Sequence, residues 1–115
     1  MVNWGIGDNN NYNTLQNISF FNGMKIKSIL VGRLHILAIT SIDLKINYYF
    51  INYYLDEGDC YSWGENSSGQ LGLGDTLNRN TPSLIKSLNK IIQISAGYFH
   101  SLAISSNLII IIFNF

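Results

Sequence analysis

Residues 60–105, CYSWGENSSGQLGLGDTLNRNTPSLIKSLNKIIQISAGYFHSLAIS, decide the fold of this chain. Short segments in which apolar and polar residues alternate follow one another here, and none of them shows the apolar spacing of a helix. Alternation of this kind between glycine-rich or polar turns is typical of β-strands. The pattern predicts four short strands, at residues 60–63, 83–88, 90–96 and 100–105.

The residue types also predict how these strands are placed. Small and aromatic residues alternate in 60–63, so this strand is expected to be half-buried. Pro82 is the only proline, and it should open the second strand, where its missing N–H does no harm. In the third strand, Ile92, Ile94 and Ala96 should share one face.

A glycine-rich segment, 64–75, connects the first strand to the second. Gly64 leaves room for another backbone to approach closely, and the later glycines can take the positive φ angles that a tight loop needs. Leu71 and Leu73 are expected to turn inward and fix the loop to the core. Asp75 can accept hydrogen bonds from the backbone amides that follow it.

The chain contains an internal repeat, because residues 3–40 align with residues 70–105 after one two-residue insertion near Gly23. The matched landmarks are Gly5, Gly7, Asp8, Gly32 and His35 in the first copy and Gly72, Gly74, Asp75, Gly97 and His100 in the second. Residues 41–57 have no counterpart. Without about 15 of them the period would be about 50 residues, within the range of propellers and solenoids.

The order of these landmarks resembles the repeat of the regulator-of-chromosome-condensation (RCC1) family. The resemblance is close over residues 58–105 and degraded over 3–40, where Trp4 replaces Leu71 and Leu15 replaces Pro82. It implies an all-β fold, a partial β-propeller of antiparallel four-stranded blades that is not closed, since a ring needs several blades. The implied division is a degenerate partial repeat at 3–40, an insertion at 41–57, a repeat at 58–105 and an apolar tail at 106–115.

The resemblance also names the residues expected to build the repeat. They are Trp63, Gly64, Gly69, Gln70, Leu71, Gly72, Gly74, Asp75, Pro82, Gly97 and His100 in the second copy and Gly5, Gly7, Asp8, Gly32 and His35 in the first. We expect these residues to be structural, and we predict no catalytic, cofactor-binding or metal-binding residue.

Three features could suggest chemistry, and each has a simpler explanation. The glycines of 72–74 could cradle a phosphate, but no lysine and no helix follow them. His35 and His100 could be catalysts or ligands, but they occupy equivalent repeat positions and are better explained as hydrogen-bonding groups that join strands. The acidic residues of 56–59 fit a solvated turn, and Cys60 fits buried packing.

Composition narrows the function classes. Charged residues make up 12% of the chain and the net charge is zero, which argues against autonomous nucleic-acid binding. The single cysteine favours a reducing compartment, the cytoplasm or the nucleus. Residues 1–10 do not resemble a secretory signal, and the apolar run 108–113 is shorter than the roughly 20 residues that cross a bilayer. Ile and Asn are so frequent that a single one of either carries little weight.

Two segments stand apart from the repeat. Residues 45–55 are rich in tyrosine, but one lysine is too little charge for base stacking to indicate nucleic-acid binding. The insertion is therefore a loop excursion or a translated intron, and residues 107–115 have the same character. Both segments are apolar and β-favouring and carry little charge, which is the pattern of aggregation-prone segments.

The predicted function is a protein–protein interaction module that is not itself an enzyme. Within the family, closed propellers act as guanine-nucleotide exchange factors for the small GTPase Ran, as chromatin-associated proteins and as scaffolds in larger proteins, including ubiquitin ligases. The resemblance implies that range, with a protein partner such as Ran and with further blades outside this chain. The alternatives are a scaffold fragment of a larger protein and a truncated gene product without independent activity.

Overall fold

The computed structural model describes residues 5–8, 10, 14–41, 45–48, 51–54, 58–88, 90–106 and 110–113. Within these ranges the fold is all-β, and the only helix, η1, is a 3-10 turn of three residues, so none of them forms a helix that could cross a membrane. The elements are η1 (Ser19–Phe21), β1 (Ile26–Val31), β2 (His35–Thr40), β3 (Lys45–Tyr48), β4 (Ile51–Tyr54), β5 (Cys60–Gly64), β6 (Arg79–Leu84), β7 (Ile91–Ala96), β8 (Ser101–Ser105) and β9 (Ile110–Phe113).

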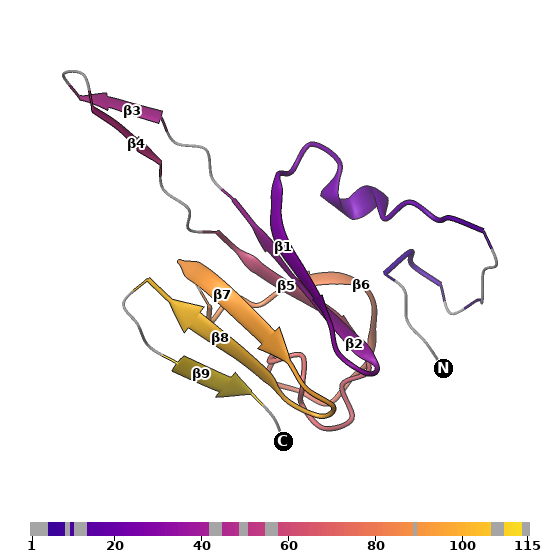
Figure 1. The fold of residues 1–115 in the computed structure, drawn as a ribbon. Coiled ribbons are helices and arrows are strands. Elements are labelled where there is room, and N and C mark those ends of the chain that lie inside the picture. The colour runs from indigo at the N-terminus through magenta and orange to yellow at the C-terminus, as the bar shows by residue number, and fades with distance from the viewer. Residues whose placement is uncertain are drawn as a thin grey trace.

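These strands form three antiparallel sheets, as Figure 1 shows. The first sheet has the order β1-β2-β5-β6, the second sheet has the order β7-β8-β9, and β3 pairs only with β4. Within the described residues the sheets do not close into a ring. The expectation of an all-β, open arrangement of antiparallel sheets is confirmed.

The four strands of residues 58–105 do not share one sheet. β5 and β6 join β1 and β2, whereas β7 and β8 begin the second sheet. The chain crosses between the sheets in the segment after β6, where the Leu88 N–H donates to the Ile85 carbonyl at 3.0 Å and closes a turn. The four-stranded sheet is therefore built from two successive sequence repeats.

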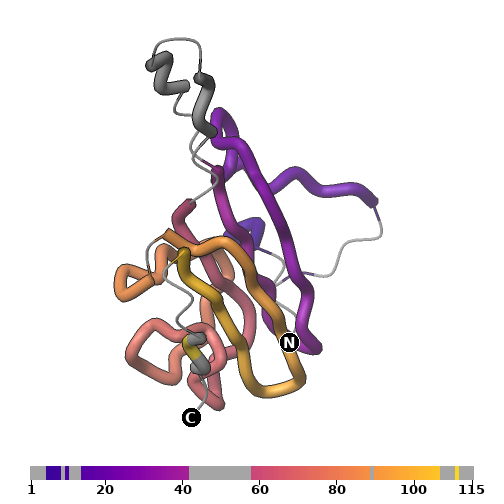
Figure 2. The backbone as a smooth tube through the Cα atoms, turned by 60° about the vertical axis from the view of Figure 1, so that its left-hand side comes forward, coloured from indigo at the N-terminus to yellow at the C-terminus, as the bar shows by residue number. Residues whose placement is uncertain are grey.

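The β1–β2 and β7–β8 hairpins are the same structural unit. Ile26 pairs with Thr40 as Ile91 pairs with Ser105, and both hairpins contain a bulge immediately after that first pair. Each turn is closed by the same bond, from the Gly32 N–H to the His35 carbonyl at 2.8 Å and from the Gly97 N–H to the His100 carbonyl at 2.9 Å. Figure 2 shows the hairpins side by side with their turns at one end. The predicted equivalence of the two units is confirmed.

The strand β9 occupies in the second sheet the place that β5 occupies in the first. Phe113 pairs with Ser101 as Trp63 pairs with Ile36. The spacing between β5 and β9 is about 50 residues, which is the period expected once the insertion is removed. Residues 110–113, assigned from the sequence to a tail beyond the repeat, thus follow the strand pattern of the repeat.

The strands of the insertion lie outside the repeat's sheets. Lys45–Tyr48 pairs with Ile51–Tyr54 in a two-stranded sheet of their own. The Thr40 N–H donates to the Asp59 carbonyl at 3.0 Å, so the β2–β5 ladder continues to the base of the insertion. The rest of residues 42–57 lies outside the described ranges.

Three local expectations were wrong. β5 is buried at all five positions, because Cys60 and Ser62 face the second sheet while Tyr61 and Trp63 face residues 18–21. Half-burial would require one open face, and β5 has none.

The other two corrections concern bulges. Pro82 lies inside β6, which begins at Arg79; β6 is an edge strand with an irregular register, so the missing N–H costs no ladder bond. In β7, Ile91 joins Ile94 in the core, and Ile92 does not, because the bulge before Gln93 shifts the alternation by one residue.

Two apolar layers hold the sheets together. The layer between the first and second sheets contains Leu37, Ile39, Cys60, Ile85, Leu88, Ile91, Ile94 and Ala103. The layer on the opposite face of the first sheet contains Ala38, Tyr61 and Trp63, with Ile18 and Phe21 packed against them. The central strands β2 and β5 are therefore covered on both faces, which is typical of strands packed in layers.

Candidate functional site at the junction of the two sheets

A buried polar network joins the two sheets at His35, the first residue of β2. Its Nε2 lies 2.8 Å from the Ser101 hydroxyl, which in turn donates to the Gln70 carbonyl at 2.9 Å. Ser101 has one proton and gives it to Gln70, so it must accept from His35 Nε2–H. His35 is therefore the Nε2–H tautomer, and the network ties β2, β8 and the glycine-rich loop together.

Burial sets the charge of His35. The side chain is 1% exposed, and burial lowers its pKa below the usual 6.5, with His100 adding to the effect and Glu65 opposing it. Protonation would place a second N–H, on Nδ1, where it has no partner. A neutral imidazole that donates through Nε2 is suited to joining strands.

The glycine three residues before each histidine has a steric role. A Cβ atom on Gly32 would lie 2.5 Å from His35 Cε1, and one on Gly97 would collide with the His100 ring in the same way. Each ring therefore lies over its own glycine. The two rings differ in environment, since His35 is buried between the sheets and His100 is exposed.

The glycine-rich loop is organised by Asn66, which the sequence did not single out. This side chain is fully buried, and its Nδ2 donates to the Asp75 and Leu77 carbonyls and to Asp75 Oδ1 at 3.0–3.1 Å. Its Oδ1 accepts from the Leu71 N–H at 2.9 Å. Ser62 adds a bond from its hydroxyl to the Leu71 carbonyl at 2.8 Å. The loop is thereby held against β5.

The loop residues predicted from the sequence lie in this network or beside it. Leu71 is fully buried and Leu73 packs on the core between the sheets. Gly64 has a φ of 111°, and a Cβ there would lie 2.5 Å from the Leu34 carbonyl oxygen, so both its conformation and its surroundings require glycine. Gly69, Gly72 and Gly74 also have positive φ angles.

Asp75 and Asp8 occupy equivalent turns. Asp75 Oδ1 accepts from the Leu77 N–H, and Asp8 Oδ1 accepts from the Asn10 N–H, both at 2.9 Å. The hydrogen bond from Arg79, whose Nη2 lies 2.7 Å from Asp75 Oδ2, is the main cause that lowers the pKa of this carboxyl. Both carboxylates therefore accept hydrogen bonds that close turns.

The first-copy glycines pack on the first sheet. A Cβ on Gly5 would lie 2.6 Å from Trp63 Nε1, so the backbone there rests directly on the buried indole. The Gly7 N–H donates to the Asn80 carbonyl at 3.0 Å, and Asn80 Nδ2 donates back to the Gly7 carbonyl. The segment before β1 is thus attached to both β5 and β6.

Two further features concern Cys60 and the metal-ligating side chains. Burial raises the pKa of Cys60 to about 12, so this thiol is a packing residue in the core. No group of three His, Cys, Asp or Glu side chains within the described ranges could hold a metal ion.

The turns of the two hairpins expose a compact patch. Arg33 Cζ lies 4.0 Å from the centre of the Tyr98 ring, and the Tyr98 and Phe99 rings meet edge to face at 4.2 Å. Tyr98 and Phe99 are 44% and 49% exposed. We call Arg33, Tyr98 and Phe99 the turn patch. It lies at one end of the two sheets, where neighbouring turns come together.

Comparisons with known proteins agree on one family. Residues 57–104 match the model of the regulator of chromosome condensation (RCC1) repeat. The ultraviolet-B receptor UVR8 of Arabidopsis thaliana is 30% identical over 103 residues, which are 88% of this chain and 20% of that protein. The human E3 ubiquitin-protein ligase HERC2 is 36% identical over 83 residues, 70% of this chain and 1% of that protein.

Among solved structures, human WBSCR16 aligns with a TM-score of 0.48 at 21% identity, over 70% of this chain and 17% of that chain. The chain spans a fifth or less of each of these proteins.

Proposed function

Residues 57–104 are an RCC1 repeat, and from this premise we propose that the chain is a protein-binding module that engages its partner through the turn patch. Repeats of this family form β-propellers that mediate protein interactions. The observation that carries the proposal is the exposure of Arg33, Tyr98 and Phe99 side by side on neighbouring turns.

The composition of the patch supports this function. Tyrosine and arginine are enriched among the residues that dominate binding energy at protein interfaces. The stacked guanidinium keeps its planar edge, which can donate two parallel hydrogen bonds to a carboxylate. A partner with an acidic side chain beside an apolar surface would match both features.

The rigidity of the patch supports it further. Each turn is closed by a backbone bond from its glycine to its histidine, and His35 anchors the first turn to the second sheet. Side chains that are already ordered lose less entropy when a partner binds.

Within this function we favour a scaffold role inside a larger protein over nucleotide exchange on a small GTPase such as Ran. Stable interfaces bury roughly 1,200–2,000 Å² in total, and the turn patch supplies three exposed side chains. The chain also spans only 1% of the human E3 ubiquitin-protein ligase HERC2, which supports a role as one part of a larger protein.

Affinity capture with quantitative mass spectrometry tests the proposal. The bait pair is the unmodified chain and the double variant Tyr98→Ala/Phe99→Ala, and the matched control is Leu77→Ala, an exposed apolar residue outside the patch. We expect the recovery of specific partners to fall about tenfold or more with the double variant and to be unchanged with the control. Equal recovery by all three baits would contradict the proposal.

A further inference from the structure

The layer between the two sheets defines how one unit of this repeat packs on the next. The first sheet contributes Leu37 and Ile39, both fully buried, and the second sheet contributes Ile91, Ile94 and Ala103. Because the β1–β2 and β7–β8 hairpins share one register, each of these residues has a counterpart in the other hairpin. These counterparts form two outer faces. The two faces are expected to be complementary, because they repeat the two sides of the layer between the sheets.

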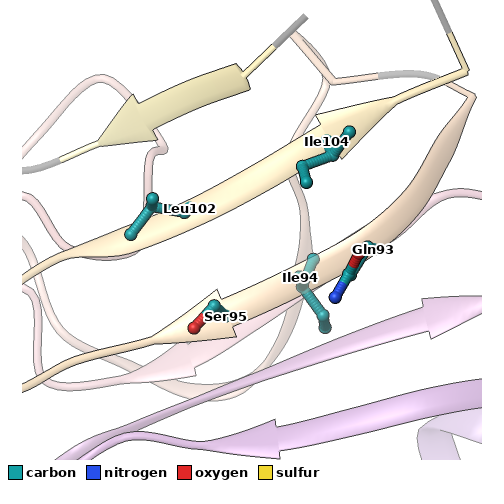
Figure 3. A pocket seen from close by; sticks show the side chains of 5 residues that line it. All are labelled: Gln93, Ile94, Ser95, Leu102 and Ile104. Atoms are coloured by element: carbon teal, nitrogen blue, oxygen red, sulfur yellow. The ribbon is translucent and has the colours of Figure 1, made fainter. Parts of the chain in front are cut away.

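The first is the outer face of the second sheet, which we call the tail face. Leu102 and Ile104 are the counterparts of Leu37 and Ile39, but they are only half-buried. Figure 3 shows them on β8 beside β7, around a shallow apolar pocket of about 120 Å³. The pocket's lining residues are Gln93, Ile94, Ser95, Leu102 and Ile104.

The second is the outer face of the β1 strand, which we call the head face. Ile26, Ile29 and Val31 are the counterparts of Ile91, Ile94 and Ala96, and they are 39%, 53% and 69% exposed. An apolar patch of this kind on a soluble protein usually marks a contact surface.

The segment before β1 completes the head face. Ile18 and Phe21 pack beside Ala38 and Trp63, as Ile85 and Leu88 pack in the layer between the sheets. The local turn is also the same, since the Phe21 N–H donates to the Ile18 carbonyl at 3.4 Å. The head face therefore has the same kinds of residues, in the same arrangement, as one side of the layer between the two sheets.

The edge of β9 completes the tail face. In the first sheet β5 lies between β2 and β6, whereas β9 pairs with β8 alone among the described strands. The first-copy segment that aligns with β6 includes residues 14–17, which are exposed and form no strand, with Leu15 fully exposed. An open strand edge and an unpaired strand-like segment fit one another.

We propose that the chain associates head to tail with a second copy of itself. The head face of one copy packs on the tail face of the next copy. Residues 14–17 of the copy that supplies the head face then pair with β9 of the copy that supplies the tail face, as a fourth strand of its second sheet. The contact joins two different surfaces, so it is heterologous and can continue from copy to copy.

This junction is weaker than the one inside the chain. Ile36 occupies the position of Ser101, so His100 of one copy meets no hydroxyl on the next. The contact therefore rests on apolar burial and strand pairing, without the buried network that His35 forms. The turn patch is outside both faces, so this inference is independent of the proposed function.

Sedimentation velocity over a concentration series tests the proposal with one variant for each face. Ile29→Asp places a charge on the head face, and Leu102→Asp places one on the tail face; Leu77→Asp is the control at an exposed apolar site elsewhere. We expect the unmodified chain and the control to associate. Each face variant alone should associate at least about tenfold more weakly.

A mixture distinguishes head-to-tail contact from other contacts. Ile29→Asp retains its tail face and Leu102→Asp retains its head face, so an equimolar mixture should form one-to-one dimers that grow no further. Circular dichroism checks that each variant is folded, and Ile29→Ser with Leu102→Ser replaces the pair if the charged variants unfold. A monomeric unmodified chain, self-association of either variant at full strength, or a mixture that stays monomeric would each overturn the proposal.

Discussion

Replacement of Ser101 by alanine should destabilise the chain through the buried network. The Ser101 hydroxyl is fully buried and serves two partners, since it accepts from His35 Nε2–H at 2.8 Å and donates to the Gln70 carbonyl at 2.9 Å. Ser101→Ala removes one oxygen and leaves two buried polar groups without a partner. The cavity is small, because one oxygen atom is lost and the methyl group remains.

The magnitude follows from those two groups. A buried donor or acceptor that loses its partner costs about 1–3 kcal/mol. The two groups share one network, so their costs do not add fully, and we expect a loss of about 2–4 kcal/mol in the free energy of unfolding. That is a large part of the 5–15 kcal/mol typical of a folded domain.

Urea unfolding followed by circular dichroism measures this loss. Ser83→Ala is the matched control, because the Ser83 hydroxyl bonds the Thr81 carbonyl at 3.3 Å at the surface, and it should change the free energy by less than about 0.5 kcal/mol. A Ser101→Ala chain whose unfolding midpoint and slope match those of the control would show that the buried network does not stabilise the fold.

Three further outcomes are expected. Burial lowers the pKa of His35, so the unfolded chain binds more protons and the free energy of unfolding should fall as pH drops below 6.5, measured by urea midpoints from pH 7.5 to 5; no change in that window would contradict it. The purified chain should not accelerate mantGDP release from Ran at micromolar concentration, because exchange needs a larger preorganised surface; acceleration well above the intrinsic rate would contradict it. Sequencing cDNA across residues 42–56 should show either a continuous reading frame, which makes the β3–β4 hairpin a genuine insertion, or a spliced junction, which makes it an intron.

The hairpins were predictable because their signals are local. Alternation sets the strands, and a glycine three residues before a histidine fixes each turn, since only glycine fits beneath the ring. Both signals recur in the two copies. The fold class and the equivalence of the units therefore followed from the sequence alone.

The pairing of strands between repeats was not predictable in the same way. No local feature shows that β5 pairs with β2 from the preceding copy, since a residue's partner across a sheet depends on which segments meet in space. The bulge in β7 had the same effect on a smaller scale, because one inserted residue exchanged the roles of Ile91 and Ile92.

The organising polar residues were missed for a compositional reason. Asn66 carries the hydrogen bonds of the glycine-rich loop, but asparagine is so frequent in this chain that one more attracted no attention. Its position between two of the loop's glycines was the available signal. Ser101 was likewise hidden, because its role depends on His35, which is distant in the sequence.

The first sheet is built from two successive repeats, and His35 joins it to the second sheet. Cross-strand NOEs in an isotope-labelled chain test this arrangement. We expect contacts between Ala38 and Tyr61, across the β2–β5 ladder, together with contacts between β2 and β7 in the layer between the sheets. Ladder contacts joining β6 directly to β7, as in a single sheet made from residues 58–105, with none between Ala38 and Tyr61, would contradict it.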